Sequence, residues 1–137
     1  MCVDFINSYS MADSLANVLL VEDDSFLANI YKTKFEMEKF KVIAAENGEI
    51  GLETARKKNP DIILLDILMP KMDGFAVLEE LKKDETTKSI PVILLTNLGQ
   101  KDDVERGLEM GAVDYFIKAH TKPTEIVEKV KSVLKIK

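Results

Sequence analysis

The sequence has few of the residues that build cross-links and metal cages. Its 137 residues include one cysteine, Cys2, and one histidine, His120. A disulfide bond needs a second cysteine, and a structural zinc site needs about four cysteine or histidine ligands. Both are therefore excluded, and His120 is interpreted as a loop histidine.

Long apolar runs and an excess of positive charge are also absent. No run approaches the roughly 20 apolar residues of a membrane-spanning helix, and residues 1–10 lack the basic start of a secretory signal. The net charge of -5 has the wrong sign for holding nucleic-acid phosphates. We therefore expect a cytoplasmic protein that binds neither a membrane nor nucleic acid directly.

Three motifs of common enzyme classes are missing. The glycine-rich loops Gly-x-Gly-x-x-Gly and Gly-x-x-x-x-Gly-Lys-[Ser/Thr] do not occur, which argues against dinucleotide and P-loop nucleotide binding. Gly-x-Ser-x-Gly is absent as well, so a hydrolase triad lacks its nucleophile.

What the sequence does contain is a regular alternation of short apolar runs and longer amphipathic segments. The length suits one domain. The predicted strands are 18–21, 41–44, 62–65, 92–95 and 113–117, and the predicted helices start near Ser25, Gly48, Gly74, Lys101 and Pro123. Asp24 or Ser25 can cap the first helix. Strands that are almost continuously apolar are typical of a parallel sheet covered on both faces.

The predicted fold is therefore α/β, a doubly wound five-stranded parallel sheet built from five βα units. Residues 1–17 show neither strand nor helix periodicity and contain a second methionine, Met11. We interpret them as a flexible leader without a function of its own, and residues 18–137 as the domain.

Polar side chains gather where the predicted strands end, the edge at which open parallel sheets bind ligands. The first strand is followed by Glu22, Asp23 and Asp24, and later strands end at Asp66, Thr96 and Lys118. A carboxylate at the end of a buried strand is costly without a proton or a cation. Mg²⁺ binds through one or two carboxylates and keeps several waters, which leaves room for a phosphoryl group. It is therefore the cation that fits these residues best.

Each of these residues also has an ordinary interpretation. An acidic pair after a strand is most often a helix cap, and a threonine or lysine at a strand end is usually structural or solvated. Their joint placement at the ends of four strands is what favours a functional site.

At these residues the chain closely resembles the receiver domain of two-component response regulators, including the chemotaxis type. The resemblance covers about 18–134. It rests on VEDD at 21–24, DIILLD at 61–66, MPKMDG at 69–74, PVILLT at 91–96 and GAVDYFIK at 111–118. It implies the flavodoxin-like strand order 2-1-3-4-5.

The resemblance also implies roles for the site residues. Asp66 accepts a phosphoryl group from the phosphohistidine of a sensor histidine kinase or phosphotransfer protein. Mg²⁺ is held by Asp24, Asp66 and the carbonyl of Leu68, with help from Asp23. Lys118 and Thr96 contact phosphoryl oxygens, and Thr96 and Tyr115 form the switch that alters an interaction face for an output partner or a further output domain. Such a domain catalyses only its own phosphorylation and dephosphorylation.

Three positions depart from the family pattern. Ala119 stands where a proline after a cis bond is usual, and a cis bond before alanine costs about 3 kcal/mol, so the loop there is expected to differ. Asn97 follows Thr96 in place of a small residue. Leu68 offers no polar side chain to an attacking water. We therefore predict an acyl phosphate that hydrolyses slowly.

Other functions are less well supported by the sequence. A Mg²⁺-dependent aspartyl-phosphate phosphatase usually needs a second acid at position 68, where this chain has leucine. A flavin carrier would need a phosphate-cradling loop in place of the acidic run that follows the first strand. A receiver-like module that only binds partners would not need the full set of Asp24, Asp66, Thr96 and Lys118.

Overall fold

The computed structural model describes residues 14–97 and 101–136. Most of the predicted leader, residues 1–13, lies outside this described part. The first strand starts at Asn17, one residue earlier than predicted, so the end of the predicted leader already belongs to the sheet. The backbone N–H of Leu15 donates to the carbonyl of Lys39 at 2.9 Å, which fixes the chain just before that strand.

Five strands alternate with helices along the chain, as the periodicity predicts. The strands are β1 (Asn17–Val21), β2 (Lys41–Ala45), β3 (Ile62–Asp66), β4 (Val92–Thr96) and β5 (Asp114–Ile117). The helices are α2 (Ser25–Met37), α3 (Gly48–Lys58), α4 (Gly74–Lys83), α5 (Lys101–Glu109) and α6 (Pro123–Leu134), with a short 3₁₀ helix η1 (Lys118–His120) after β5. All five predicted helix starts are confirmed.

The strands form one parallel sheet in the order β2-β1-β3-β4-β5, which confirms the expected topology. In the register of the sheet, Asp66 at the end of β3 pairs with Leu95, one residue before Thr96. All five strands therefore end at the same edge, and the residues that follow them are brought together there.

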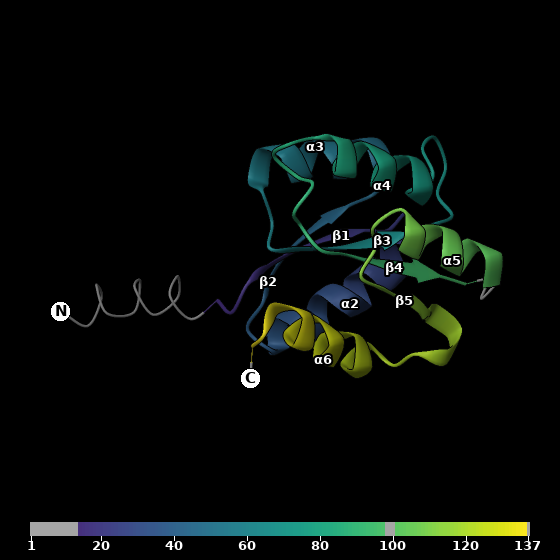
Figure 1. Ribbon diagram of the computed structural model, residues 1–137. Coiled ribbons are helices and arrows are strands. Elements are labelled where there is room, and N and C mark those ends of the chain that lie inside the picture. Colours follow the sequence, from purple (N-terminus) through teal and green to yellow (C-terminus); the bar gives the residue numbers. More distant parts are fainter. Residues whose placement is uncertain (1–13, 98–100, 137) are drawn as a thin grey trace.

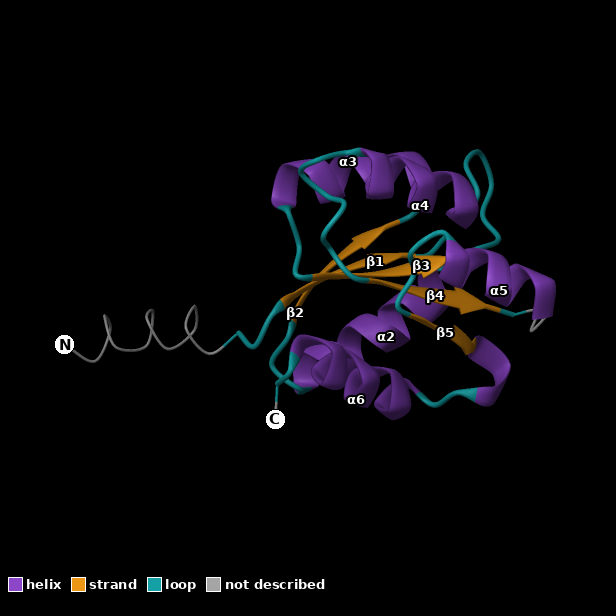
Figure 2. Cartoon of the chain, in the orientation of Figure 1, coloured by secondary structure: helices purple, strands orange, loops and turns teal. Residues whose placement is uncertain are grey.

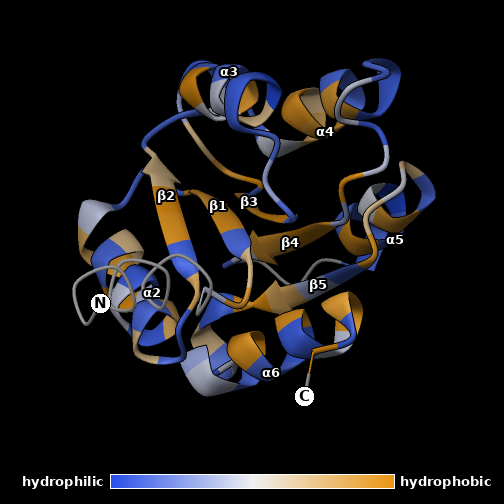
Figure 3. Ribbon diagram, turned by 90° about the vertical axis from the view of Figure 1, so that its left-hand side faces the viewer, coloured by the Kyte–Doolittle hydropathy of each residue, from blue (hydrophilic) through white to orange (hydrophobic). Residues whose placement is uncertain are grey.

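Helices cover both faces of the sheet (Figures 1 and 2). Helices α3 and α4 lie on one face, and α2 and α6 lie on the other. Every residue of β3 and of β4 is buried. Figure 3 shows the strands mostly in hydrophobic colours and the helices in both. This is the pattern expected when apolar strands are sandwiched between amphipathic helices.

Three helices start at the functional edge of the sheet with a side-chain cap. Asp24 caps α2, Asn47 caps α3 and Asp73 caps α4; Asp24 accepts two hydrogen bonds from backbone N–H groups of the first turn, and Asn47 and Asp73 accept one each. Such caps satisfy donors that have no partner inside the helix. They explain why the chain turns directly from a strand or loop into a helix at this edge. Within the described residues, no helix is both long and apolar enough to cross a membrane.

Candidate functional site

Three carboxylates meet at the carboxyl edge of the sheet. Glu22 and Asp23 directly follow β1, and Asp66 is the last residue of β3. Each offers a carboxylate oxygen within 4.8 Å of the others. Glu22 and Asp66 are buried, at 2% and 3% exposed, whereas Asp23 is open to solvent. Because its donors are carboxylate oxygens, the group fits a hard divalent cation such as Mg²⁺.

A buried lysine completes the group. The Nζ of Lys118 lies 3.0 Å from Oδ2 of Asp66 and also contacts Oε1 of Glu22. The lysine side chain is 5% exposed. One ammonium group therefore bridges two buried carboxylates that come from different strands, and it compensates part of their charge.

The environment of this group changes its protonation. Burial raises the pKa of Asp66 to about 7; Lys118 opposes this rise and the negative charge of Glu22 adds to it. Burial alone lowers the pKa of Lys118, but hydrogen bonds and charge from Glu22 and Asp66 outweigh burial and raise it. The charged form of Lys118 is thus favoured, and Asp66 holds a proton more readily than an exposed aspartate does.

Thr96 and Tyr115 belong to the opposite side of the sheet from Lys118. Side chains alternate along a strand, and Leu94, two residues before Thr96, packs in the cluster beneath α3 and α4. Tyr115 packs partly against that same cluster. Thr96 is buried at the end of β4, next to the strand that ends at Asp66. The two predicted switch residues therefore share one face of the sheet.

The loop after β3 folds tightly against the site. The backbone N–H of Leu68 donates to Oδ1 of Asp66 at 3.3 Å, and the N–H of Gly74 donates to the carbonyl of Ile67 at 2.8 Å. A Cβ on Gly74 would lie 2.4 Å from the carbonyl oxygen of Asp66. Only glycine permits this approach, which holds the loop close to the Asp66 carboxylate.

The structure places Asp24 differently from the expectation. Its Oδ1 accepts the N–H groups of Phe26 and Leu27, at 2.9 and 3.2 Å, and it does not belong to the carboxylate group. Glu22 belongs to that group instead, although the sequence analysis assigned no metal-binding role to Glu22. Two signals could have identified it: alternation puts Glu22 on the same side as the buried Leu20, and Asp24 already had a sufficient role as a cap.

The structure describes all three positions that depart from the family pattern. No peptide bond between described residues is cis, and Lys118, Ala119 and His120 form η1. The chain thus leaves β5 through a turn of 3₁₀ helix. The side chain of Leu68 is 54% exposed and Asn97 is exposed, so both lie at the surface beside the site.

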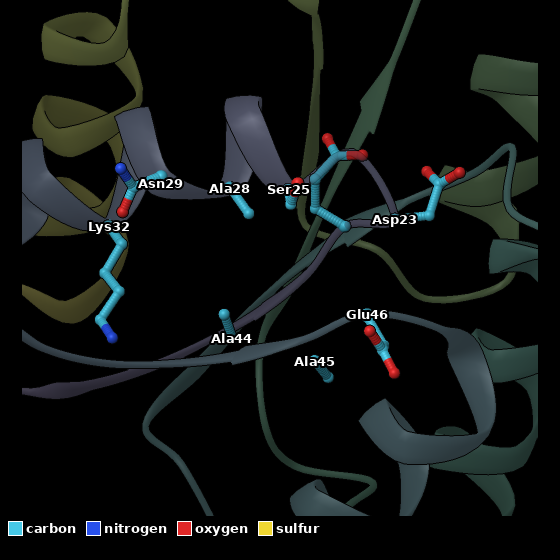
Figure 4. A pocket seen from close by; sticks show the side chains of 9 residues that line it. Asp23, Ser25, Ala28, Asn29, Lys32, Ala44, Ala45 and Glu46 are labelled. Carbon is cyan, nitrogen blue, oxygen red and sulfur yellow. The ribbon is translucent and has the colours of Figure 1, made fainter.

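A pocket of about 260 Å³ adjoins the carboxylates (Figure 4). It lies between α2 and the ends of β1 and β2, and Figure 4 shows Asp23 and Glu46 toward one side of it and Lys32 toward the other. Its floor is formed by the small side chains of Ala28, Ala44 and Ala45. Glu22 and Asp23 line this pocket, so these two carboxylates of the group border an open hollow.

Comparison with known proteins agrees with this geometry. The family model described as the response regulator receiver domain matches residues 18–131. The chain belongs to this family. A receiver domain is a phosphorylation switch of two-component signalling and not a conventional enzyme, and the buried acidic group at the sheet edge is consistent with its phosphorylation site.

Several curated response regulators are similar over most of this chain. The chain is 42% identical over 112 residues to response regulator PleD of Caulobacter vibrioides, covering 82% of this chain and 24% of PleD. It is 38% identical over 114 residues to the DNA-binding dual master transcriptional regulator RpaA of Synechocystis, covering 83% of this chain and 46% of RpaA. The chain spans about half the length, or less, of these relatives.

Solved structures show the same fold. The receiver domain of the Francisella response regulator 1452 has a TM-score of 0.81 and 32% identity, covering 88% of this chain and 97% of that one. A CheX-CheY complex with BeF₃ and magnesium from Borrelia burgdorferi has a TM-score of 0.78 and 32% identity, covering 86% of this chain and 88% of that one.

Proposed function

We propose that Asp66 accepts a phosphoryl group from a phosphohistidine, with residues 18–137 as the receiver domain. The observation that supports this most strongly is the buried Asp66 carboxylate with Lys118 at 3.0 Å and the Leu68 N–H at 3.3 Å. In the reaction an Asp66 oxygen forms a bond to phosphorus. The phosphorus–nitrogen bond breaks, and its electron pair goes to the imidazole, which then takes a proton from solvent.

We propose that Mg²⁺ is the cation of this site. Glu22, Asp23 and Asp66 would hold it, with Glu22 in the role first given to Asp24; the carbonyl of Leu68 remains a predicted ligand. Bound Mg²⁺ would supply positive charge that compensates the carboxylates and the incoming phosphoryl oxygens. The all-oxygen donor set and the exposure of Asp23 support this choice.

The neighbouring side chains have positioning and charge-compensating roles. The ammonium of Lys118 is held beside Asp66 and can pair with a phosphoryl oxygen, while the hydroxyl of Thr96 donates to another. Phosphoryl transfer depends mainly on such positioning and charge compensation. Slow hydrolysis by water then returns the domain to its starting state.

The switch uses the opposite face of the sheet. Thr96 and Tyr115 share the side covered by α3 and α4, so a movement of Thr96 toward the phosphoryl group opens space into which Tyr115 turns. The surface near β5 changes shape as a result. A shift between two packings of a few kcal/mol is enough to alter the affinity for an output partner, or for an output domain, strongly.

The phosphoryl donor is proposed to be a histidine kinase or a phosphotransfer protein that docks on α2. Phe26, in the first turn of α2, is 72% exposed, and its backbone is hydrogen-bonded to the residue that follows Asp23. A large exposed aromatic side chain beside a reactive site is typical of an interaction anchor. The cytoplasmic location remains a prediction from the sequence.

The proposed chemistry is tested by intact mass after incubation with acetyl phosphate. We expect the mass of one added phosphoryl group, only when Mg²⁺ is present. Asp66→Asn is the control and should gain nothing, because an amide oxygen cannot form the acyl phosphate. A gain of equal size in the control would show that another residue is modified and would contradict the proposal.

A further inference from the structure

Helix α2 buries one polar side chain against the sheet. Its buried residues are Ala28, Tyr31 and Phe35, and Tyr31 is 3% exposed. Among the described residues, no side chain or backbone group is hydrogen-bonded to the Tyr31 hydroxyl. A buried tyrosine usually finds a partner for this group, and phenylalanine would fill the same space without needing one. The proposed phosphoryl transfer gives the hydroxyl no task so far.

Tyr31 lies on the face of the sheet that carries the buried carboxylates. It belongs to the same apolar cluster as Leu20 and Leu64. Each of these leucines stands two residues before a carboxylate of the site, Glu22 in one case and Asp66 in the other. Because side chains alternate along a strand, positions two residues apart face the same side. The tyrosine and the two carboxylates therefore share one side of the sheet.

The ammonium of Lys118 is brought to this region from the far side of the sheet. Lys118 directly follows β5, the edge strand, yet its Nζ contacts Oε1 of Glu22, which follows β1. Its side chain must therefore pass the ends of β4 and β3, the strands between them. Helix α2 packs against β1 and β2. The amine thus ends beneath the helix that carries Tyr31.

The electrostatics of Tyr31 agree with this placement. Burial raises the pKa of its phenol; the charge of Lys118 opposes the rise, and the charges of Glu22 and Asp66 add to it. Lys118 is the charged group that acts most strongly on the phenol. The phenol keeps its proton at neutral pH, so its oxygen can accept a hydrogen bond while its O–H donates another.

The ammonium of Lys118 still has one hydrogen to donate. An ammonium carries three N–H donors, and Glu22 and Asp66 accept one each. Among the described side chains, Oγ of Ser14 is the only polar atom that is both enclosed and unpartnered. The unpartnered Tyr31 hydroxyl is therefore reached by solvent. Polar groups too far apart for a direct hydrogen bond are commonly joined by one water.

From these observations we propose that Tyr31 is a positioning residue for Lys118. A water accepts the third N–H of the ammonium and donates to the Tyr31 hydroxyl oxygen. This bridge holds the amine beside the Asp66 oxygen that receives the phosphoryl group. The consequence for catalysis rests on the proposed function: without the bridge the amine is held less firmly, so transfer slows while binding of the donor is unchanged.

A crystal structure of the full chain without phosphodonor tests the bridge. One water is expected within about 3.2 Å of both the Tyr31 hydroxyl oxygen and Nζ of Lys118, and it should be lost in Tyr31→Phe. A hydroxyl that bonds neither this water nor Lys118 would overturn the proposal. This observation does not depend on phosphorylation, so its failure and the failure of the proposed function are distinguishable.

The rate of phosphorylation by acetyl phosphate with Mg²⁺ tests the positioning role. Tyr31→Phe should lower the maximal rate about fivefold, the effect of losing one hydrogen bond, and leave the half-saturating donor concentration unchanged. Phe35→Leu, on the same buried side of α2, changes packing without removing a polar atom and should alter neither value. An equal loss in Phe35→Leu, or an unchanged maximal rate in Tyr31→Phe, would overturn the proposal.

Discussion

At the scale of single residues, the site depends on which acidic side chain performs which task. Glu22 and Asp66 are buried with Lys118, Asp23 is open to solvent, and Asp24 is committed to capping α2. Three consecutive acidic residues therefore have three different environments. A substitution at each position is expected to affect a different property.

Magnesium affinity should distinguish Asp23 from Asp24. Asp23→Asn removes a carboxylate of the proposed ion site, so Mg²⁺ binding measured by calorimetry should weaken by more than the roughly tenfold that loss of an outer-shell partner costs. Asp24→Asn should leave the affinity unchanged, because an asparagine oxygen caps a helix about as well as aspartate. The reverse order of effects would return the metal role to Asp24.

The stability of the metal-free domain should depend on the protonation of Asp66. Its pKa is raised to about 7 in the fold, so the folded state binds the proton more tightly than the unfolded chain does. At a pH well below 4 the carboxyl group is protonated in both states, so its burial does not lower the free energy of unfolding. As the pH rises toward 7, the burial of this group lowers the free energy of unfolding by a growing amount, at most about 4 kcal/mol. The loss is constant above that pH.

Urea unfolding in EDTA tests this dependence. Asp66→Asn should be more stable than the wild type at pH 7 and above, with a difference that shrinks toward pH 4. Glu85→Gln is a suitable control, since the Glu85 side chain is 82% exposed and its loss should produce little change at any pH. A difference for Asp66→Asn that grows as the pH falls would contradict the burial argument.

At the scale of elements, the sequence predicts the frame of the site well. Four of the five predicted strands are nearly continuous apolar runs, and the helix starts carry local signals such as Asp24 and Pro123. These signals depend on neighbouring residues, so they can be read without the fold. The contact between Glu22 and Lys118 joins residues 96 positions apart. No local pattern specifies it, and the local signals of the sequence favour Asp24 over Glu22.

Helix α2 links the site to its proposed donor. Phe26→Ser should lower the transfer rate from a phosphohistidine-bearing phosphotransfer protein by about tenfold, the effect of losing one interaction anchor. Phosphorylation by acetyl phosphate should be unchanged, because a small donor needs no docking surface. Ile50→Ser, on the opposite face, serves as the control for both donors. An equal loss with both donors would mean that Phe26 supports the site rather than the docking.

At the scale of the whole molecule, the domain is a sheet whose two faces have different tasks. By the alternation of side chains along each strand, Asp66 belongs to the face beneath α2 and α6, and the proposed switch residues Thr96 and Tyr115 belong to the face beneath α3 and α4. A phosphoryl group accepted at this edge, as proposed, would therefore influence both faces. How long that influence lasts depends on the stability of the acyl phosphate.

The lifetime of the phosphorylated domain should be long. Leu68 is 54% exposed beside Asp66 and cannot orient an attacking water with a polar group. After removal of acetyl phosphate, the fraction phosphorylated, followed by intact mass, should decay over a time much longer than seconds. Leu68→Asn should shorten this time several-fold, because its amide can hold a water. Decay of the wild type within seconds would contradict the prediction.

The most direct test of the central claim is to locate the phosphoryl group itself. An acyl phosphate is reduced by borohydride to an alcohol, so phosphorylated Asp66 becomes homoserine, which tandem mass spectrometry of peptides assigns to one position. We predict homoserine at position 66, dependent on both Mg²⁺ and the phosphodonor. Homoserine at Asp23, Asp24 or Glu22 (there as its longer homologue), or none at position 66 in protein shown to be phosphorylated, would contradict the account.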